Sequence, residues 1–193
     1  MWYSIALLVH ILGAVALFSA VSLVVTAFVR MRQARTLEQI REWVAVAQFA
    51  GKSLMFIGLV ILAPALYMVT VAWGFTTPWV LAALLTFVVL AIMGAAVSGG
   101  TIQRLSALVQ AAPPGQVPDT VRSHLLARRL WLAEGIRAML LVGMVCLMTL
   151  KPDLAFSLLI LLGMVILGLL LGLLLDAMTQ RFIGRRVGKE QLA

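Results

Sequence analysis

His10 is the side chain most able to do chemistry in the first apolar stretch, residues 3–29, which holds no Lys, Arg, Asp or Glu. It lies seven residues into that stretch, roughly 10 Å deep at the helical rise of about 1.5 Å per residue. Ala6, Gly13 and Ala14 share its helical face, and small residues let a neighbouring helix come close. We therefore expect His10 to point into a helix bundle rather than toward lipid.

Two methionines lie at a similar depth in later apolar stretches, Met68 in the second and Met144 in the fourth. Imidazole and thioether suit Cu(I), and a His with a Met can also hold haem iron axially. His10, Met68 and Met144 are therefore candidate cofactor-binding residues for copper or haem. The competing interpretation is packing, since methionine fills gaps in apolar cores and a single carbonyl can satisfy a buried His.

A second group of candidates is charged: Lys52, Glu134, Arg137 and Asp176 all lie within or at the edge of apolar stretches. Charges at that depth are costly unless they are paired, and Glu134 with Arg137 has the i, i+3 spacing of a helical ion pair. A buried charge cluster of Lys52, Glu134 and Arg137 could form a proton or anion vestibule. It could equally be an ion-paired anchor at the membrane interface.

These residues must be positioned by helices that cross a membrane. Of the 193 residues, 63% are hydrophobic and 11% are charged, and the mean hydropathy is +1.10, values typical of an integral membrane protein. About 20 apolar residues span a bilayer. The sequence predicts an all-α bundle in one domain, residues 1–193, with five transmembrane helices over about 3–29, 45–73, 79–102, 130–150 and 154–175.

The basic residues predict the orientation of this bundle. Fourteen of the fifteen Lys and Arg residues fall in or beside segments on one side, and Lys151 alone falls on the other. The positive-inside rule then predicts a multi-pass membrane protein with its N-terminus outside and its C-terminus in the cytoplasm. The same rule explains the high isoelectric point without nucleic acid as a partner.

The connections also carry signals. The prediction is a polar connection over residues 103–129, broken by Pro113-Pro114-Gly115, in which Asp119 or Thr120 caps a short helix. Thr36 is the expected N-cap of the second helix, and Pro64 should kink that helix.

No catalytic triad, phosphate loop, metal-binding Cys or His spacing, or paired membrane carboxylate stands out, which argues against an enzyme. Small-residue spacings such as Gly168-x-x-x-Gly172 permit close helix packing, within the bundle or between copies. The function predicted first is a non-catalytic accessory or assembly subunit, with lipid and either other membrane subunits or further copies as partners. The alternatives are a copper- or haem-handling protein that uses His10, and a small proton-coupled transporter.

Three short segments, Leu8-Val9-His10-Ile11-Leu12-Gly13-Ala14, Ala63-Pro64 and Leu147-Met148-Thr149-Leu150-Lys151-Pro152, carry a resemblance. With them the chain resembles a bacterial family of predicted integral membrane proteins of unknown function, distantly similar to the membrane domain of the copper-resistance D family. The segments are scattered in order over residues 8–152. The resemblance implies a location in the bacterial plasma (inner) membrane and a metal or haem role for His10.

Overall fold

Five helices in the computed structural model are long and apolar enough to cross a membrane, which confirms the predicted all-α fold. The structure describes residues 1–113, 115 and 117–190, with the backbone alone for residues 181–190, and these residues form no strand. The elements in chain order are α1 (Trp2–Gln33), α2 (Leu37–Met68), η1 (Val69–Trp73), α3 (Pro78–Met93), η2 (Gly94–Gly99), α4 (Gly100–Ala111), α5 (Asp119–Leu126), α6 (Arg128–Leu150) and α7 (Leu154–Glu190).

Each predicted span lies inside one continuous helical stretch, but the helices extend past the predicted boundaries. Helix α7 continues from the predicted end at residue 175 to Glu190, and the third stretch, through α3, η2 and α4, continues to Ala111 where a polar connection was expected from Gln103. That expectation was wrong because Ile102, Leu105 and Val109 recur at helical spacing and are buried on one face of α4. Arg41 of α2 donates hydrogen bonds to the Val109 carbonyl oxygen at 3.3 and 3.1 Å.

The helix caps follow the sequence in one case and depart from it in another. Thr36 is the N-cap of α2, and its hydroxyl accepts a hydrogen bond from the backbone N–H of Gln39 at 3.4 Å, as predicted. The short helix α5 is present, but Pro118 occupies its N-cap position and Asp119 lies in its first turn. Pro fits there because its fixed φ suits the approach to a helix.

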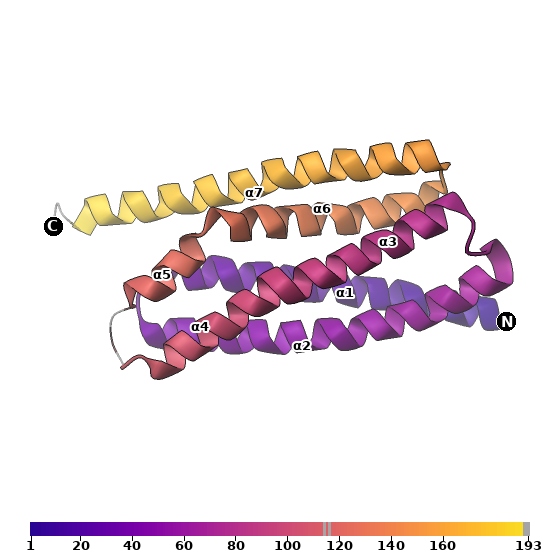
Figure 1. Cartoon of the computed structure of the whole chain (residues 1–193). Helices are drawn as coiled ribbons and strands as arrows, with labels where there is room; N and C mark the ends of the chain where they lie inside the picture. The colour runs from indigo at the N-terminus through magenta and orange to yellow at the C-terminus, as the bar shows by residue number, and fades with distance from the viewer. Residues whose placement is uncertain (114, 116, 191–193) are drawn as a thin grey trace.

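Connections alternate between the two ends of the bundle (Figure 1). The N-terminus, the turn between η1 and α3 and the turn between α6 and α7 lie at one end, which we call the N-terminal end (Figure 1). The turn between α1 and α2, helix α5 and the C-terminal part of α7 lie at the other, the α5 end (Figure 1). This alternation is the one that five successive membrane crossings require.

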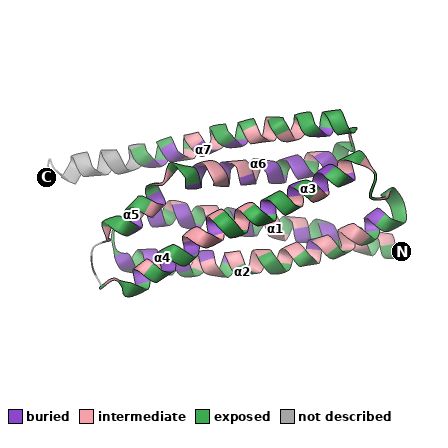
Figure 2. Ribbon diagram, in the orientation of Figure 1, coloured by how far each residue is buried: buried purple, intermediate pink, exposed green. Residues whose placement is uncertain are grey.

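The deepest packing lies toward the α5 end, where α1, α2, α4, α5 and α6 meet (Figure 2). Many apolar side chains along the outside of the long helices are exposed, which suits a chain surrounded by lipid rather than water. The largest side chains that are almost fully buried in the α5-end core are Phe28, Met31, Leu37, Ile40, Leu105, Leu125 and Trp131.

Helices α6 and α7 touch through three glycines. A Cβ atom added at Gly168 would lie 2.5 Å from the Cα of Ile136, and one at Gly172 would lie 2.6 Å from the carbonyl oxygen of Trp131. A Cβ added at Gly135 would meet the backbone of both α7 glycines. The Gly168-x-x-x-Gly172 spacing therefore serves contact within the chain, where only glycine lets the two backbones come this close.

Candidate functional site

The His10 imidazole is held between α1 and α2. Its Nδ1 lies 3.1 Å from the backbone carbonyl oxygen of Ile61, and the residue is buried. The helices approach closely here, because a Cβ added at Gly13 would lie 2.5 Å from Cγ1 of Ile61. A carbonyl oxygen only accepts hydrogen bonds, so Nδ1 carries a proton and Nε2 is the ring nitrogen left to bind a ligand.

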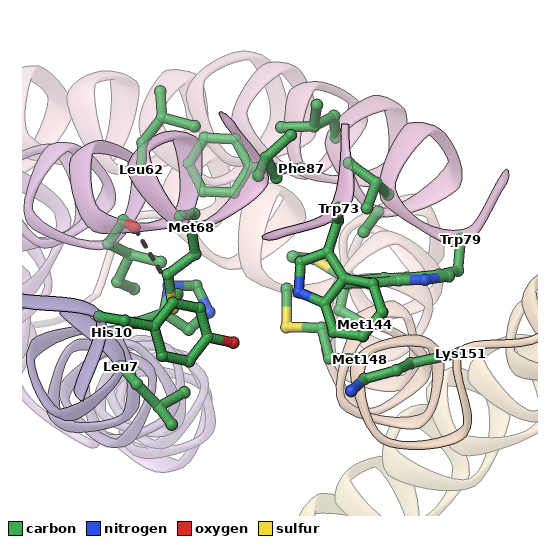
Figure 3. Close-up of a pocket in the computed structure, with 17 residues that line it drawn as sticks. Leu7, His10, Leu62, Met68, Trp73, Trp79, Phe87, Met144, Met148 and Lys151 are labelled. Carbon is green, nitrogen blue, oxygen red and sulfur yellow. Dashed lines mark hydrogen bonds between the residues drawn. The ribbon is translucent and has the colours of Figure 1, made fainter. Parts of the chain in front are cut away.

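A pocket of about 260 Å³ opens beside this imidazole at the N-terminal end (Figure 3). The three candidate cofactor residues, His10 from α1, Met68 from α2 and Met144 from α6, all line it, and Met148 joins them one turn further along α6. The other residues around the pocket are mostly apolar or aromatic: Tyr3, Leu7, Ile61, Leu62, Ala65, Val69, Trp73, Trp79, Val80, Ala83, Leu84, Phe87 and Lys151.

A wide helical turn shapes one wall of the pocket. Helix α2 ends at Met68 and continues as the π-turn η1, in which the N–H of Gly74 donates to the carbonyl oxygen of Val69 at 2.7 Å. Gly74 has a φ of 81°, a left-handed conformation that glycine adopts without strain. Single π-turns occur often at functional sites, and this one brings Met68, Val69 and Trp73 to the pocket.

Lys151 lies on the opposite side of the pocket from His10 (Figure 3). It caps α6 in a left-handed conformation, with φ 50° and ψ 51°, and its Nζ lies 4.1 Å from the centre of the Trp73 ring. The rings of Trp73 and Trp79 meet edge to face with their centres 5.3 Å apart. The pocket wall thus carries one cation on an aromatic surface, and none of its lining residues is an Asp or Glu.

The second predicted group is divided by the structure. Glu134 and Arg137 are buried and form an i, i+3 ion pair, Oε2 to Nη2, at 2.6 Å. Ser98 of η2 donates to Oε1 of Glu134 at 2.5 Å and accepts from Nη1 of Arg137 at 2.5 Å. The direct 2.6 Å contact is a charge contact, since it lacks the angle of a hydrogen bond, and Ser98 supplies the directed bonds. Lys52 does not join them and is exposed.

Asp176 belongs to another buried pair. Its Oδ1 accepts a hydrogen bond from Nη2 of Arg32 at 2.9 Å, and Nη1 of Arg32 donates to Oγ1 of Thr179 at 2.6 Å. The Arg32 guanidinium also lies over the Trp131 ring, 5.0 Å from its centre. The sequence did not single out Arg32, because it lies between Arg30 and Arg35 in a segment predicted to be a cytoplasmic loop.

No protein-family model, curated protein or solved structure matches this chain. The resemblance to the copper-resistance D membrane domain therefore stays a prediction. What this chain does must be argued from its own residues, beginning with the pocket beside His10.

Proposed function

We propose that this chain is a membrane protein that handles Cu(I) in the pocket beside His10. The support is one observation: a single pocket gathers an imidazole and the thioethers of Met68, Met144 and Met148. These donors are neutral and soft or borderline, and thioethers favour Cu(I) over hard cations such as Mg²⁺ or Ca²⁺. Hard cations would need carboxylate oxygens, and no carboxylate lines the pocket.

The hydrogen bond of His10 fits a ligand role. Metal-binding histidines usually donate their second ring nitrogen to a carbonyl or carboxylate, which fixes the tautomer and the ring orientation. The Ile61 carbonyl oxygen, 3.1 Å from Nδ1, fills that role and leaves Nε2 to bind. The Nε2 of His10 and the sulfur atoms of Met68 and Met144 would hold the ion.

Haem is the second candidate, favoured by the aromatic and apolar wall that includes Phe87, Trp73 and Trp79. A His and a Met can be its axial ligands. The volume of about 260 Å³ lies below the roughly 300–1,000 Å³ usual for organic ligands of drug size. A bare ion is therefore the better fit, and a haem would have to extend beyond the pocket.

Copper binding can be measured on protein purified in detergent, under anaerobic and reducing conditions, by competition with a Cu(I) chelator. We expect His10→Ala to weaken Cu(I) binding at least about 10-fold, because it removes the only imidazole of the pocket. The matched control is His124→Ala, which changes the half-buried histidine of α5, outside the pocket, and should leave binding unchanged.

Two results would contradict the copper proposal. Equal Cu(I) affinity in wild type and His10→Ala would remove His10 from the site. A haem absorption band that is present in wild type and lost in His10→Ala, without copper uptake, would assign the pocket to haem.

The other predicted features are compatible with copper handling. The pocket lies at the N-terminal end, which is the outer end if the positive-inside orientation holds for a bacterial inner membrane. An accessory subunit that receives Cu(I) there and delivers it to a partner needs no catalytic motif. Proton-coupled transport has less support, because Glu134 is paired with Arg137 and Lys52 lies apart from both.

A further inference from the structure

A smaller cavity, of about 40 Å³, lies near the α5 end of the bundle. The end of α1, the first turns of α2, and α5 with the segment before it enclose it, far along α1 from the His10 pocket. Two of its lining residues are basic and none is acidic. The lining residues are Met31, Arg32, Ala34, Ile40, Val117, Arg122, Leu125 and Leu126.

Arg32 brings a fixed cation to this cavity. Its side chain is only 1% exposed, and Thr179, Asp176 and the Trp131 ring hold the guanidinium on other sides. Its Nε is buried and has no hydrogen-bond partner. A buried donor without a partner is costly, so a hydrogen-bond acceptor that reached Nε of Arg32 would stabilise the protein.

Arg122 supplies a second cation at the exposed side of the same cavity. Asp176 already balances the charge of Arg32, so Arg122 adds net positive charge. A space of about 40 Å³ exceeds the roughly 10–15 Å³ that a cavity needs to hold one water molecule, so it can admit an oxygen-bearing anionic group. Guanidinium groups bind phosphate oxygens with charge-assisted hydrogen bonds, which are stronger than neutral ones.

The surroundings favour a lipid phosphate over a free ion. Helix α5 is amphipathic: it buries Val121 and Leu125 and leaves Leu126, beside the cavity, 41% exposed. An exposed leucine next to a cationic cavity suits a molecule with both an acyl chain and a phosphate. More arginines lie at the same end, outside the cavity, and make the surface around it positive: Arg30, Arg35, Arg128 and Arg129.

We propose that this cavity binds the phosphate of an anionic phospholipid, with Arg32 and Arg122 as its donors and Leu126 against the acyl chain. The site is separate from the proposed copper site. It would hold α5 against α1 and α2, so the lipid would stabilise the α5 end of the bundle.

Native mass spectrometry of the detergent-solubilised full chain, titrated with phosphatidylglycerol, tests this proposal. We expect one tightly bound phosphatidylglycerol in wild type. In Arg122→Gln the affinity for phosphatidylglycerol should fall at least about 10-fold, because one charge-assisted contact is lost. Arg128→Gln, which removes an exposed arginine outside the cavity, is the matched control and should bind as wild type does. Phosphatidylcholine, which has the phosphate without net charge, should bind more weakly to wild type.

Two outcomes would overturn the proposal. Equal losses in Arg122→Gln and Arg128→Gln would show attraction to surface charge in general and no site at the cavity. Binding of inorganic phosphate alone that depends on Arg122 and excludes phosphatidylglycerol would assign the cavity to a free anion. Circular dichroism of Arg122→Gln confirms that a loss of binding does not reflect unfolding.

Discussion

At the scale of single residues, the buried polar groups determine what this chain can do. The Ser98 hydroxyl bridges Glu134 and Arg137, with 2.5 Å to each. Ionised groups away from water cost several kcal/mol each unless their donors and acceptors are matched. Ser98 supplies that match from another helical segment, and so joins η2 to α6.

We expect Glu134→Gln to destabilise the protein by about 3–5 kcal/mol, because it leaves the buried Arg137 without its counter-charge. Ser98→Ala should cost less, about 1–3 kcal/mol, since it removes two hydrogen bonds but keeps the ion pair. Unfolding in mixed detergent micelles, followed by circular dichroism, measures both.

Lys52→Gln is the control for these substitutions, because an exposed side chain should change stability by no more than about 0.5 kcal/mol. A Glu134→Gln variant that is as stable as wild type but has lost proton flux in proteoliposomes would contradict a purely structural role for the Glu134–Arg137 pair. That result would revive the transport hypothesis.

At the scale of elements, helix α6 contributes residues both to the buried ion pair and to the pocket. Glu134, Arg137, Leu141, Met144 and Met148 follow one another at spacings of three and four, so they share one face of this helix. The ion pair and the two pocket methionines of α6 therefore lie on the same face of one helix. The close contact of α6 with α7 on another side of the helix helps to determine how that face is turned toward the bundle.

Gly172→Ala tests the contact between α6 and α7. The added Cβ would lie 2.6 Å from the Trp131 carbonyl oxygen and 2.7 Å from the Cα of Leu132, both backbone atoms that cannot move aside alone. We expect a loss of about 1–3 kcal/mol in the free energy of unfolding, as for overpacking in a core. The same detergent unfolding assay measures it.

Gly163→Ala is the matched control on the same helix, because nothing lies within 4 Å of a Cβ added there. That variant should be as stable as wild type or up to about 1 kcal/mol more stable, given the helix propensity of alanine over glycine. If both variants behaved alike, the close approach of α6 and α7 would be wrong.

At the scale of the whole molecule, the two ends of the bundle differ in charge. Among the residues that the structure describes, Lys151 is the lone Lys or Arg at the N-terminal end, and the arginines gather at or near the α5 end. Anionic lipid is the environment proposed for the α5 end, and the pocket beside His10, where Lys151 is the one charged lining residue, opens at the other. The pocket that His10, Met68 and Met144 line and the arginine-rich surface therefore lie toward opposite ends of the bundle.

Labelling of single cysteines tests this orientation in cells. With Cys146 replaced by Ala, a cysteine at Thr76, in the turn before α3, should react with a membrane-impermeant maleimide from outside. A cysteine at Ser123, on α5, should react only after the membrane is opened. The reverse pattern would place the N-terminus in the cytoplasm and the pocket on the cytoplasmic side.

The sequence by itself determined the class, the number of crossings and their alternation, since apolar length and helical spacing are local properties of the chain. It also selected His10, Met68 and Met144 by residue type and depth. It misjudged the stretch from Gln103 to Ala111, where a polar composition concealed an amphipathic helix.

Only the tertiary structure decided which residues meet. Depth along separate helices cannot say how each helix is rotated, so a common pocket for three candidates required the packing of α1, α2 and α6. Lys52 and Asp176 had the expected depth, yet one is exposed and the other pairs with Arg32 across a sequence separation of 144 residues. Helix rotation depends on long-range contacts such as Gly13 against Ile61 and Gly172 against Trp131. The spacing of small residues predicted close packing at these glycines, but it did not identify the residues that they contact.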